Sequence, residues 1–263
     1  MGRIEDAFRS RPAFMPYFPL GFPTVEASVD VIEGLARGGA DLIEVGLPFS
    51  DPLADGPVIQ RATQVALQNG MTVAKGLAAV GELRQRGVTI PLVLMGYYNP
   101  MLAYGLARLA AEAAQAGADG FIVPDLPPEE AAEMEAALGE HGLPLVRMLA
   151  PTTPPERAAR VLAGAKGFMY LVSLTGVTGA RSEVAAGLEA FVARTRAMAG
   201  DLPLCVGFGI STPEQAGAVG ALADGIIVGS ACVKALENAA DPGREAEAFA
   251  RRFRVGLGQA QAG

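Results

Sequence analysis

Eight short apolar segments recur along the 263-residue chain, and a stretch with helical periodicity follows six of them. The apolar segments are 14–20, 41–48, 91–98, 120–125, 144–150, 167–173, 203–209 and 225–230. Most are continuously apolar rather than alternating, which is typical of parallel strands covered on both faces. The helical stretches are 25–37, 103–116, 128–139, 154–163, 183–199 and 212–221. This repeated alternation predicts an α/β fold, a (β/α)8 barrel of the TIM type.

The main alternative is a doubly wound open sheet, which also alternates strands with helices. Such sheets commonly have fewer strands, and their Gly-x-Gly-x-x-Gly fingerprint does not follow the first apolar segment. A length of 263 residues suits one parallel barrel. No linker or low-complexity segment interrupts the pattern, so we expect a single domain over residues 1–263, with a frayed tail after about residue 256.

Composition and charge exclude several classes of function. The formal net charge of -7 argues against binding to nucleic acid or to an anionic membrane surface, because both require a basic face. No apolar stretch is long enough to span a membrane and the N-terminus lacks a signal-peptide core, so we expect a cytoplasmic protein. Cys205 and Cys232 lie in apolar segments and are expected to be buried. No cluster has metal-ligand spacing, so no metal is expected.

Acidic side chains gather at the end of the second apolar segment, where a barrel would carry its active site. Glu44 lies inside the segment, so burial would raise its pKa toward the range used for proton transfer at neutral pH. A structural ion pair is the alternative role for Glu44. Asp51 and Asp55 follow on the next loop, where Asp-Pro and Asp-Gly-Pro are also ordinary turn sequences.

Glycines mark the ends of the last three apolar segments. The sixth runs into Leu-Thr-Gly-Val-Thr-Gly over 174–179, the seventh ends in Gly-Phe-Gly over 207–209, and the eighth ends in Val-Gly-Ser over 228–230. Glycine lets backbone N–H groups approach an anion closely, and a helix N-terminus adds its positive dipole end. We therefore expect a phosphate site on the loops after strands six to eight, with tight turns alone as the alternative.

Five motifs, taken in order, resemble one known family. They are Ile-Glu-Val-Gly-Leu-Pro-Phe-Ser-Asp-Pro-Leu-Ala-Asp-Gly-Pro at 43–57, Tyr-Tyr-Asn-Pro at 97–100, Val-Pro-Asp-Leu-Pro at 123–127, Ser-Leu-Thr-Gly-Val-Thr-Gly at 173–179 and Gly-Phe-Gly-Ile-Ser at 207–211. The chain resembles the tryptophan synthase α subunit family over essentially its whole length. The resemblance implies a carbon–carbon lyase that cleaves indole-3-glycerol phosphate to indole and D-glyceraldehyde 3-phosphate.

The resemblance also implies roles for individual residues. Glu44 matches the general acid/base, Asp55 the carboxylate that binds the indole N–H, and Tyr170 a tyrosine near Glu44. Thr178 matches a residue of the loop that closes over the substrate. The phosphate ligands implied are Gly179, Gly209, Gly229 and Ser230. The indole-pocket residues implied are Tyr17, Met95, Ile122, Met148, Phe208 and Ile227.

The partner implied by the resemblance is a β subunit that carries pyridoxal phosphate and receives indole through a channel. The assembly would be αββα, an allosteric complex of tryptophan biosynthesis, with Asp51 and Asp125 facing the partner and no cofactor in this chain. Two other functions stay open at this point. One is a different phosphate-binding barrel enzyme, such as a sugar-phosphate isomerase or a stand-alone indole lyase. The other is a weak enzyme that mainly activates a β subunit.

Overall fold

The strands of the chain form a closed parallel barrel. The computed structural model describes residues 2–9, 12–172, 181–207 and 209–259. Its strands pair in the order β1-β2-β3-β4-β5-β6-β7-β8, and β8 pairs with β1 to close the ring. The strands are β1 (Ala13–Pro19), β2 (Ile43–Gly46), β3 (Leu92–Met95), β4 (Gly120–Ile122), β5 (Leu145–Leu149), β6 (Met169–Val172), β7 (Leu204–Gly207) and β8 (Gly225–Val228). Each falls within or overlaps a predicted apolar segment, so the predicted (β/α)8 barrel is confirmed.

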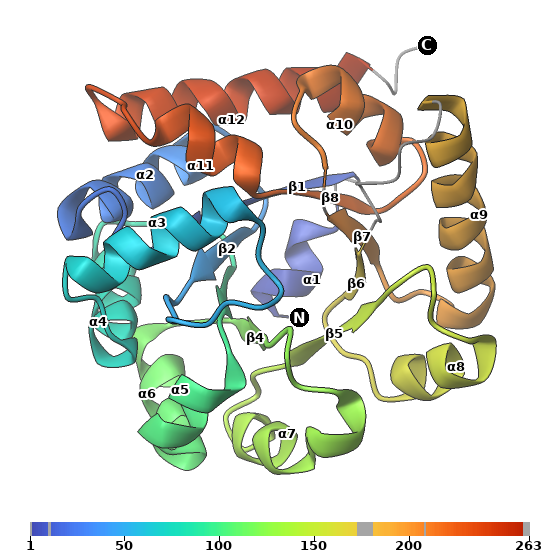
Figure 1. Ribbon diagram of the computed structural model, residues 1–263, viewed down its shortest axis with the longest axis horizontal. Helices are drawn as coiled ribbons and strands as arrows, with labels where there is room; N and C mark the ends of the chain where they lie inside the picture. The colour runs from blue at the N-terminus through green and yellow to red at the C-terminus, as the bar shows by residue number, and fades with distance from the viewer. Residues whose placement is uncertain (1, 10–11, 173–180, 208, 260–263) are drawn as a thin grey trace.

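Helices surround the barrel on its outside (Figure 1). They are α2 (Val25–Arg37), α3 (Pro57–Gln68), α4 (Val73–Gln85), α5 (Tyr98–Tyr104), α6 (Leu106–Ala116), α7 (Ala132–Gly139), α8 (Pro155–Ala163), α9 (Arg181–Ala199), α10 (Pro213–Gly220), α11 (Ser230–Leu236) and α12 (Pro242–Gln259), with a 3-10 turn η1 (Pro128–Glu130). The short α1 (Arg3–Ala7) packs against the N-terminal end of the barrel, where the ring centroids of Phe8 and Phe168 lie 5.9 Å apart. No helix in the described ranges is long and apolar enough to cross a membrane.

The structure corrects two of the predicted boundaries. The helix expected over 103–116 is two helices, because Gly105 adopts a φ of +93° between α5 and α6. The tail expected to fray after residue 256 is helical through Gln259. Leu257 there is buried, and a Cβ at Gly256 would collide with Pro213 of α10, so close packing of α12 against α10 holds this end.

The strand register decides which side chains share one face of the barrel wall. Tyr17 pairs with Glu44, Met95 pairs with Ile122, and Met148 pairs with Tyr170. Paired residues of parallel strands point to the same face, and so do residues two apart on one strand. Following these pairs around the ring assigns one common face to Tyr17, Glu44, Met95, Ile122, Met148, Tyr170 and Ile227.

That common face is the interior of the barrel. Tyr170 on β6 lies across the barrel from Glu44 on β2, and after burial the nearby Glu44 carboxyl is the next cause of its raised pKa, so the two side chains lie near one another inside the barrel. Glu44 is only 1% exposed. The register therefore places Glu44, the predicted catalytic residue, in the barrel interior. The described residues predicted for an indole pocket lie in the same interior.

Three aspartates hold the opposite, N-terminal end of the barrel together. Asp41, Asp119 and Asp224 precede β2, β4 and β8, and each accepts the backbone N–H of a residue in the preceding strand at 2.8 Å. Each also pairs with an arginine: Asp41 with Arg254, Asp119 with Arg84 and Asp224 with Arg196. We call these three units the aspartate clasps. They tie neighbouring strands to the helix layer.

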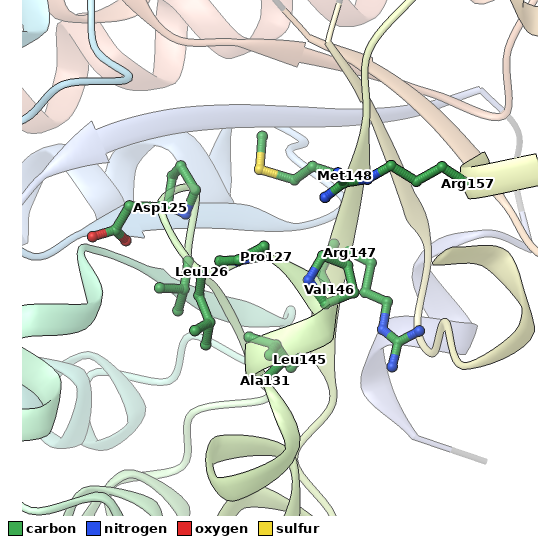
Figure 2. A pocket seen from close by; sticks show the side chains of 12 residues that line it. Asp125, Leu126, Pro127, Ala131, Leu145, Val146, Arg147, Met148 and Arg157 are labelled. Carbon is green, nitrogen blue, oxygen red and sulfur yellow. The ribbon is translucent and has the colours of Figure 1, made fainter. Parts of the chain in front are cut away.

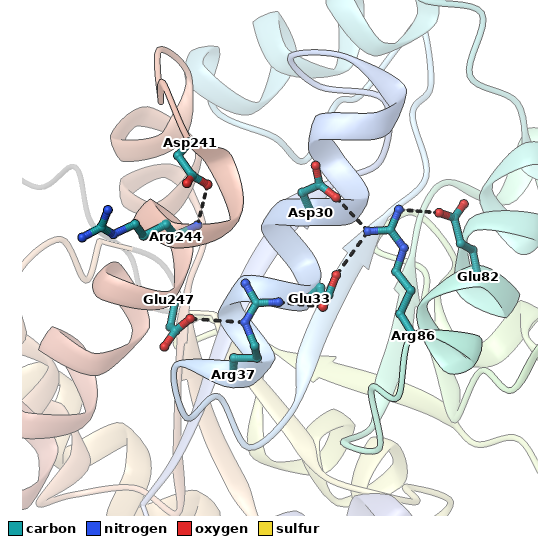
Figure 3. A network of polar contacts seen from close by, with 8 residues as sticks. All are labelled: Asp30, Glu33, Arg37, Glu82, Arg86, Asp241, Arg244 and Glu247. Atoms are coloured by element: carbon teal, nitrogen blue, oxygen red, sulfur yellow. Dashed lines mark hydrogen bonds and ion pairs between the residues drawn. The ribbon is translucent and has the colours of Figure 1, made fainter.

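A surface network of ion pairs joins three of the outer helices (Figure 3). Arg86, the C-cap of α4, contacts Glu82 on that helix and Asp30 and Glu33 on α2. Arg37 of α2 contacts Glu33 and, on α12, Glu247. Exposed pairs of this kind contribute little one at a time, so we assign this network to the helix layer and not to function.

Candidate active site

Glu44 is a buried carboxyl group without a counter-charge. Its Oε1 atom has no hydrogen-bond partner within the described ranges of the chain. Burial raises the pKa of Glu44 to about 8, and the nearby Asp55 carboxylate adds to the rise. The side chain is therefore protonated at neutral pH and poised to exchange its proton. The alternative role considered for Glu44, a structural ion pair, has no support among the salt bridges of the described residues.

Asp55 lies on the loop between β2 and α3 and is half-buried. Burial raises its pKa to about 6, while a hydrogen bond from the Tyr97 hydroxyl to Asp55 Oδ2, at 3.1 Å, opposes the rise. The carboxylate is thus largely ionised at neutral pH, in contrast to Glu44. Two neighbouring carboxyl groups with separated pKa values are the arrangement expected for an acid and a base at one site.

Tyr97 is a site residue that the sequence reasoning did not single out. Its hydroxyl accepts the N–H of Ala54 at 3.0 Å and donates to Asp55, so it fixes the Asp55 loop at two points. Its ring packs on Phe49, with ring centroids 5.4 Å apart. Tyr97 stands 42 residues after Asp55, and only its place in the Tyr-Tyr-Asn-Pro motif marks it in the sequence.

Tyr17 and Tyr170 line the barrel interior near Glu44, and both are buried. The Tyr17 hydroxyl lies against Gly46, and the Tyr170 hydroxyl lies against Gly207, so closely that a Cβ on either glycine would collide with it. Glycine within a strand marks such a close approach. Burial, together with the nearby Glu44 and Asp55 carboxyls, raises the pKa values of both tyrosines, so both hydroxyls keep their protons.

The residues predicted for an indole pocket share the face that carries Glu44, as far as they are described. Tyr17, Met95, Ile122 and Ile227 are buried, and Met148 is half-buried. Phe208 lies outside the described residues. Met148 also lines a pocket of about 260 Å³ between β5 and the segment that follows β4, and Asp125 lines the same pocket (Figure 2). The lining thus includes both an interior residue, Met148, and an exposed one, Asp125.

The glycines predicted to bind phosphate are described in part. Gly209 has a φ of +79°, which favours glycine, on the loop after β7. Gly229 is the N-cap of α11, and Ser230 is its first residue. A Cβ on Gly229 would make only ordinary contacts with Ile59 and Tyr17, so protein packing alone does not require glycine there. Gly179 and Thr178 lie outside the described residues.

Asp51 and Asp125, predicted to face a partner, are both exposed on loops at the C-terminal ends of strands. Asp51 accepts a hydrogen bond from the Ser50 hydroxyl, and Asp125 accepts the N–H of Tyr98 at the start of α5. A second role for Asp125 is therefore to cap α5. Among the described residues, no three His, Cys, Asp or Glu side chains form a group that could hold a metal ion.

Comparisons with known proteins agree on one family. The family model for the tryptophan synthase alpha chain matches residues 5–260. The tryptophan synthase alpha chain of Chloroflexus aggregans is 52% identical over 255 residues, which cover 95% of each chain. That of Roseiflexus castenholzii is 54% identical over 242 residues, covering 90% of this chain and 92% of the relative.

Solved structures agree with the sequence relatives. The crystal structure of tryptophan synthase subunit alpha from Legionella pneumophila has a TM-score of 0.90 at 37% identity, and the match covers 98% of this chain and 99% of that one. A chain of Mycobacterium tuberculosis tryptophan synthase has a TM-score of 0.88 at 41% identity, over 97% and 98% of the two chains. On its sequence and its fold, the chain belongs to the tryptophan synthase alpha chain family.

Proposed function

We propose that Glu44 is the general acid/base of this family's reaction. The tryptophan synthase α subunit is a carbon–carbon lyase: it cleaves indole-3-glycerol phosphate to indole and D-glyceraldehyde 3-phosphate, a step of tryptophan biosynthesis. The observation that carries the assignment is a buried carboxyl group with a pKa of about 8 on the barrel interior. A group with this pKa is protonated at neutral pH and ionises within about one pH unit of it, which suits it to give and to take a proton.

The proton moves in two steps in this proposal. Glu44 first donates its proton to C3 of the indole ring, and the ring nitrogen gains positive charge. The resulting Glu44 carboxylate then accepts the proton of the glycerol hydroxyl on the carbon attached to C3. The carbon–carbon bond breaks, its electron pair returns to the ring, and the products are indole and an aldehyde. Glu44 ends the cycle protonated, as it began.

Asp55 supplies the negative charge that this intermediate requires. An ionised carboxylate on the Asp55 loop would accept the indole N–H and stabilise the positive ring nitrogen. Its pKa of about 6 supports this role, because Asp55 is ionised at a pH where Glu44 is not. Tyr170, whose hydroxyl lies in the interior near both carboxyl groups, completes the proposed catalytic set.

The substrate would lie with its flat ring among the interior side chains and its phosphate at the ends of the last strands. The proposed ring pocket consists of Tyr17, Met95, Ile122, Met148, Phe208 and Ile227. The proposed phosphate ligands are Gly179, Gly209, Gly229 and Ser230, with the N-terminus of α11 contributing backbone N–H groups. Thr178 would act in closing the loop after β6 over the substrate.

The α subunit family works in complex with a β subunit. We propose an αββα assembly in the cytoplasm in which the pyridoxal phosphate belongs to the partner and this chain needs no cofactor. The proposed contact surface surrounds Asp51 and Asp125. Leu53, two residues from Asp51, is 90% exposed, and Leu102 on α5 is 45% exposed. A partner chain seated here would remove these two apolar side chains from water.

The decisive experiment measures indole released from indole-3-glycerol phosphate by the purified protein, alone and with a β subunit. We expect release by the wild type, a higher rate with the β subunit, and no release above background by Glu44→Gln. Normal turnover by Glu44→Gln would refute the assignment of Glu44. Full activity without any partner would instead indicate a stand-alone lyase.

A further inference from the structure

The Tyr17 hydroxyl lies one residue layer above Glu44, toward the mouth of the barrel. Tyr17 on β1 is the register partner of Glu44 on β2, so the two side chains start at the same height on the same face. The next residue of β2 on that face is Gly46, and the Tyr17 hydroxyl lies against it. The Tyr17 side chain therefore leans upward, between Glu44 and the loop that carries Asp55.

Tyr170 repeats this geometry on the other side of the barrel. Its register partner on β7 is Cys205, and its hydroxyl lies against Gly207, which is again two residues further along the neighbouring strand. The barrel interior thus holds two tyrosine hydroxyls, each lying against a glycine two residues further along the neighbouring strand. Tyr170 has an assigned role in the proposed reaction, whereas the hydroxyl of Tyr17 has none beyond lining the ring pocket.

Glu44, the register partner of Tyr17, has an open hydrogen-bonding position among the described residues. Asp55 already receives a hydrogen bond from Tyr97, at 3.1 Å. Glu44 Oε1 receives none within the described part of the chain. Burial and the nearby Asp55 and Glu44 carboxyls raise the pKa of the Tyr17 phenol, and a hydrogen bond with Thr63 on α3 opposes the rise. The phenol therefore keeps its proton and can donate it in a hydrogen bond.

We propose that Tyr17 is a positioning residue whose hydroxyl donates a hydrogen bond to Glu44 each time Glu44 has given up its proton. A buried carboxylate without a donor is costly to form, so this bond would make the proton transfer to carbon easier. The proposal rests on the proposed acid/base role of Glu44. The other titratable groups around Tyr17 are Asp55, Tyr97 and Tyr170, with Cys205 next to Tyr170.

The test is Tyr17→Phe, which keeps the ring and removes the hydroxyl. We expect kcat to fall about tenfold with KM nearly unchanged, because a hydrogen bond to a charged group is lost. The alkaline limb of the rate profile should move up by roughly one pH unit, since ionised Glu44 loses a donor. A raised KM with normal kcat and an unmoved alkaline limb would overturn the proposal.

Two further variants keep this test sharp. Tyr104→Phe removes a hydroxyl that donates to Glu112 at the surface, and it should leave kcat and both limbs unchanged. Thr63→Val should move the alkaline limb of the rate profile in the same direction as Tyr17→Phe, by a smaller amount. An unmoved limb in Thr63→Val would count against the proposal, even if Tyr17→Phe fails to fold.

Full activity in Glu44→Gln would refute the proposed function itself. An inactive Glu44→Gln beside a wild-type profile in Tyr17→Phe would refute only the role of Tyr17.

Discussion

Buried carboxyl groups at the two ends of the barrel differ in their hydrogen-bond and ion-pair partners. At the N-terminal end, each aspartate clasp receives a backbone N–H and an arginine. At the C-terminal end, Glu44 and Asp55 have no ion pair among the described residues, and the Asp55 carboxylate accepts a hydrogen bond from Tyr97. Both ends remove carboxyl groups from water, but among the described residues only the N-terminal end pairs them with arginines.

The difference appears in the pKa values. Burial raises the pKa of Asp41, yet the Phe14 amide and the Arg254 guanidinium oppose the rise. At Glu44, whose pKa reaches about 8, no group within the described ranges opposes the rise. A compensated carboxylate stays charged and stabilises the fold, whereas an uncompensated one exchanges its proton easily. The comparison predicts that variants at the two ends fail in different assays.

The largest effect is expected from Glu44→Gln, which removes the exchangeable proton and keeps the shape of the side chain. Indole release should fall by about a thousandfold to ten-thousandfold, the range of general acid/base catalysis. A steady-state assay with purified protein measures this, and circular dichroism checks that the variant is folded. A fall of less than about tenfold would show that the proton moves by another route.

The next largest effect belongs to the other end of the barrel. Asp119→Ala should lower the free energy of unfolding by about 3–5 kcal/mol, because it leaves the largely buried Arg84 guanidinium without its carboxylate. The backbone N–H of Leu92 also loses its acceptor. Urea unfolding measures the loss. The kcat of the folded fraction should stay at the wild-type value. A lowered kcat would show that the N-terminal end also affects catalysis.

Asp55→Asn should reduce kcat about a hundredfold while the protein stays folded and still binds substrate. The amide keeps the size of the side chain but lacks the charge that would stabilise the ring nitrogen. Rapid-mixing kinetics and a direct binding measurement separate the two effects. If circular dichroism showed global unfolding instead, Asp55 would be a structural residue, like the aspartates of the clasps. The variant should still activate a β subunit.

The smallest effect is expected from Tyr97→Phe, which removes the hydroxyl that fixes the Asp55 loop. The pKa of Asp55 should rise above about 6, because Tyr97 is the group that lowers it. The acidic limb of the rate profile should therefore move up, with about a tenfold loss of kcat at neutral pH. The packing of the ring on Phe49 is retained. An unmoved acidic limb would mean that Tyr97 does not tune Asp55.

The sequence was sufficient to predict the barrel and the strand ends that carry the candidate site residues. Apolar segments of the right length locate the strands, and Pro57 begins α3 as its place after Gly56 suggests. The break at Gly105 was not predicted, because an alanine-rich stretch has helical periodicity on both sides of it. Glu44 stood out because a charged residue inside an apolar strand is costly unless it has a use.

What the sequence could not predict depends on contacts between distant residues. Arg84 and Asp119 are 35 residues apart, and the Gly-Ala-Asp sequence before β4 is an ordinary turn signal when considered alone. Likewise, the donor for Asp55 comes from Tyr97, after a different strand. Only the closed register of the barrel brings these partners together, so their roles follow from the fold and not from local pattern.

The central claim is that the mouth of the barrel holds an uncompensated carboxyl group at a cost in stability. The folded pKa of Glu44, about 8, lies above its ordinary value of 4.5. Between these values the native state holds a proton that the unfolded chain releases, so stability falls as pH rises through this window and levels off above pH 8.

The most direct test compares the free energy of unfolding of the wild type and Glu44→Gln from about pH 5 to pH 9. Glutamine does not ionise, so the account predicts that the variant gains stability relative to the wild type as pH rises, by a few kcal/mol in total. A difference between the two proteins that does not change with pH would contradict the account.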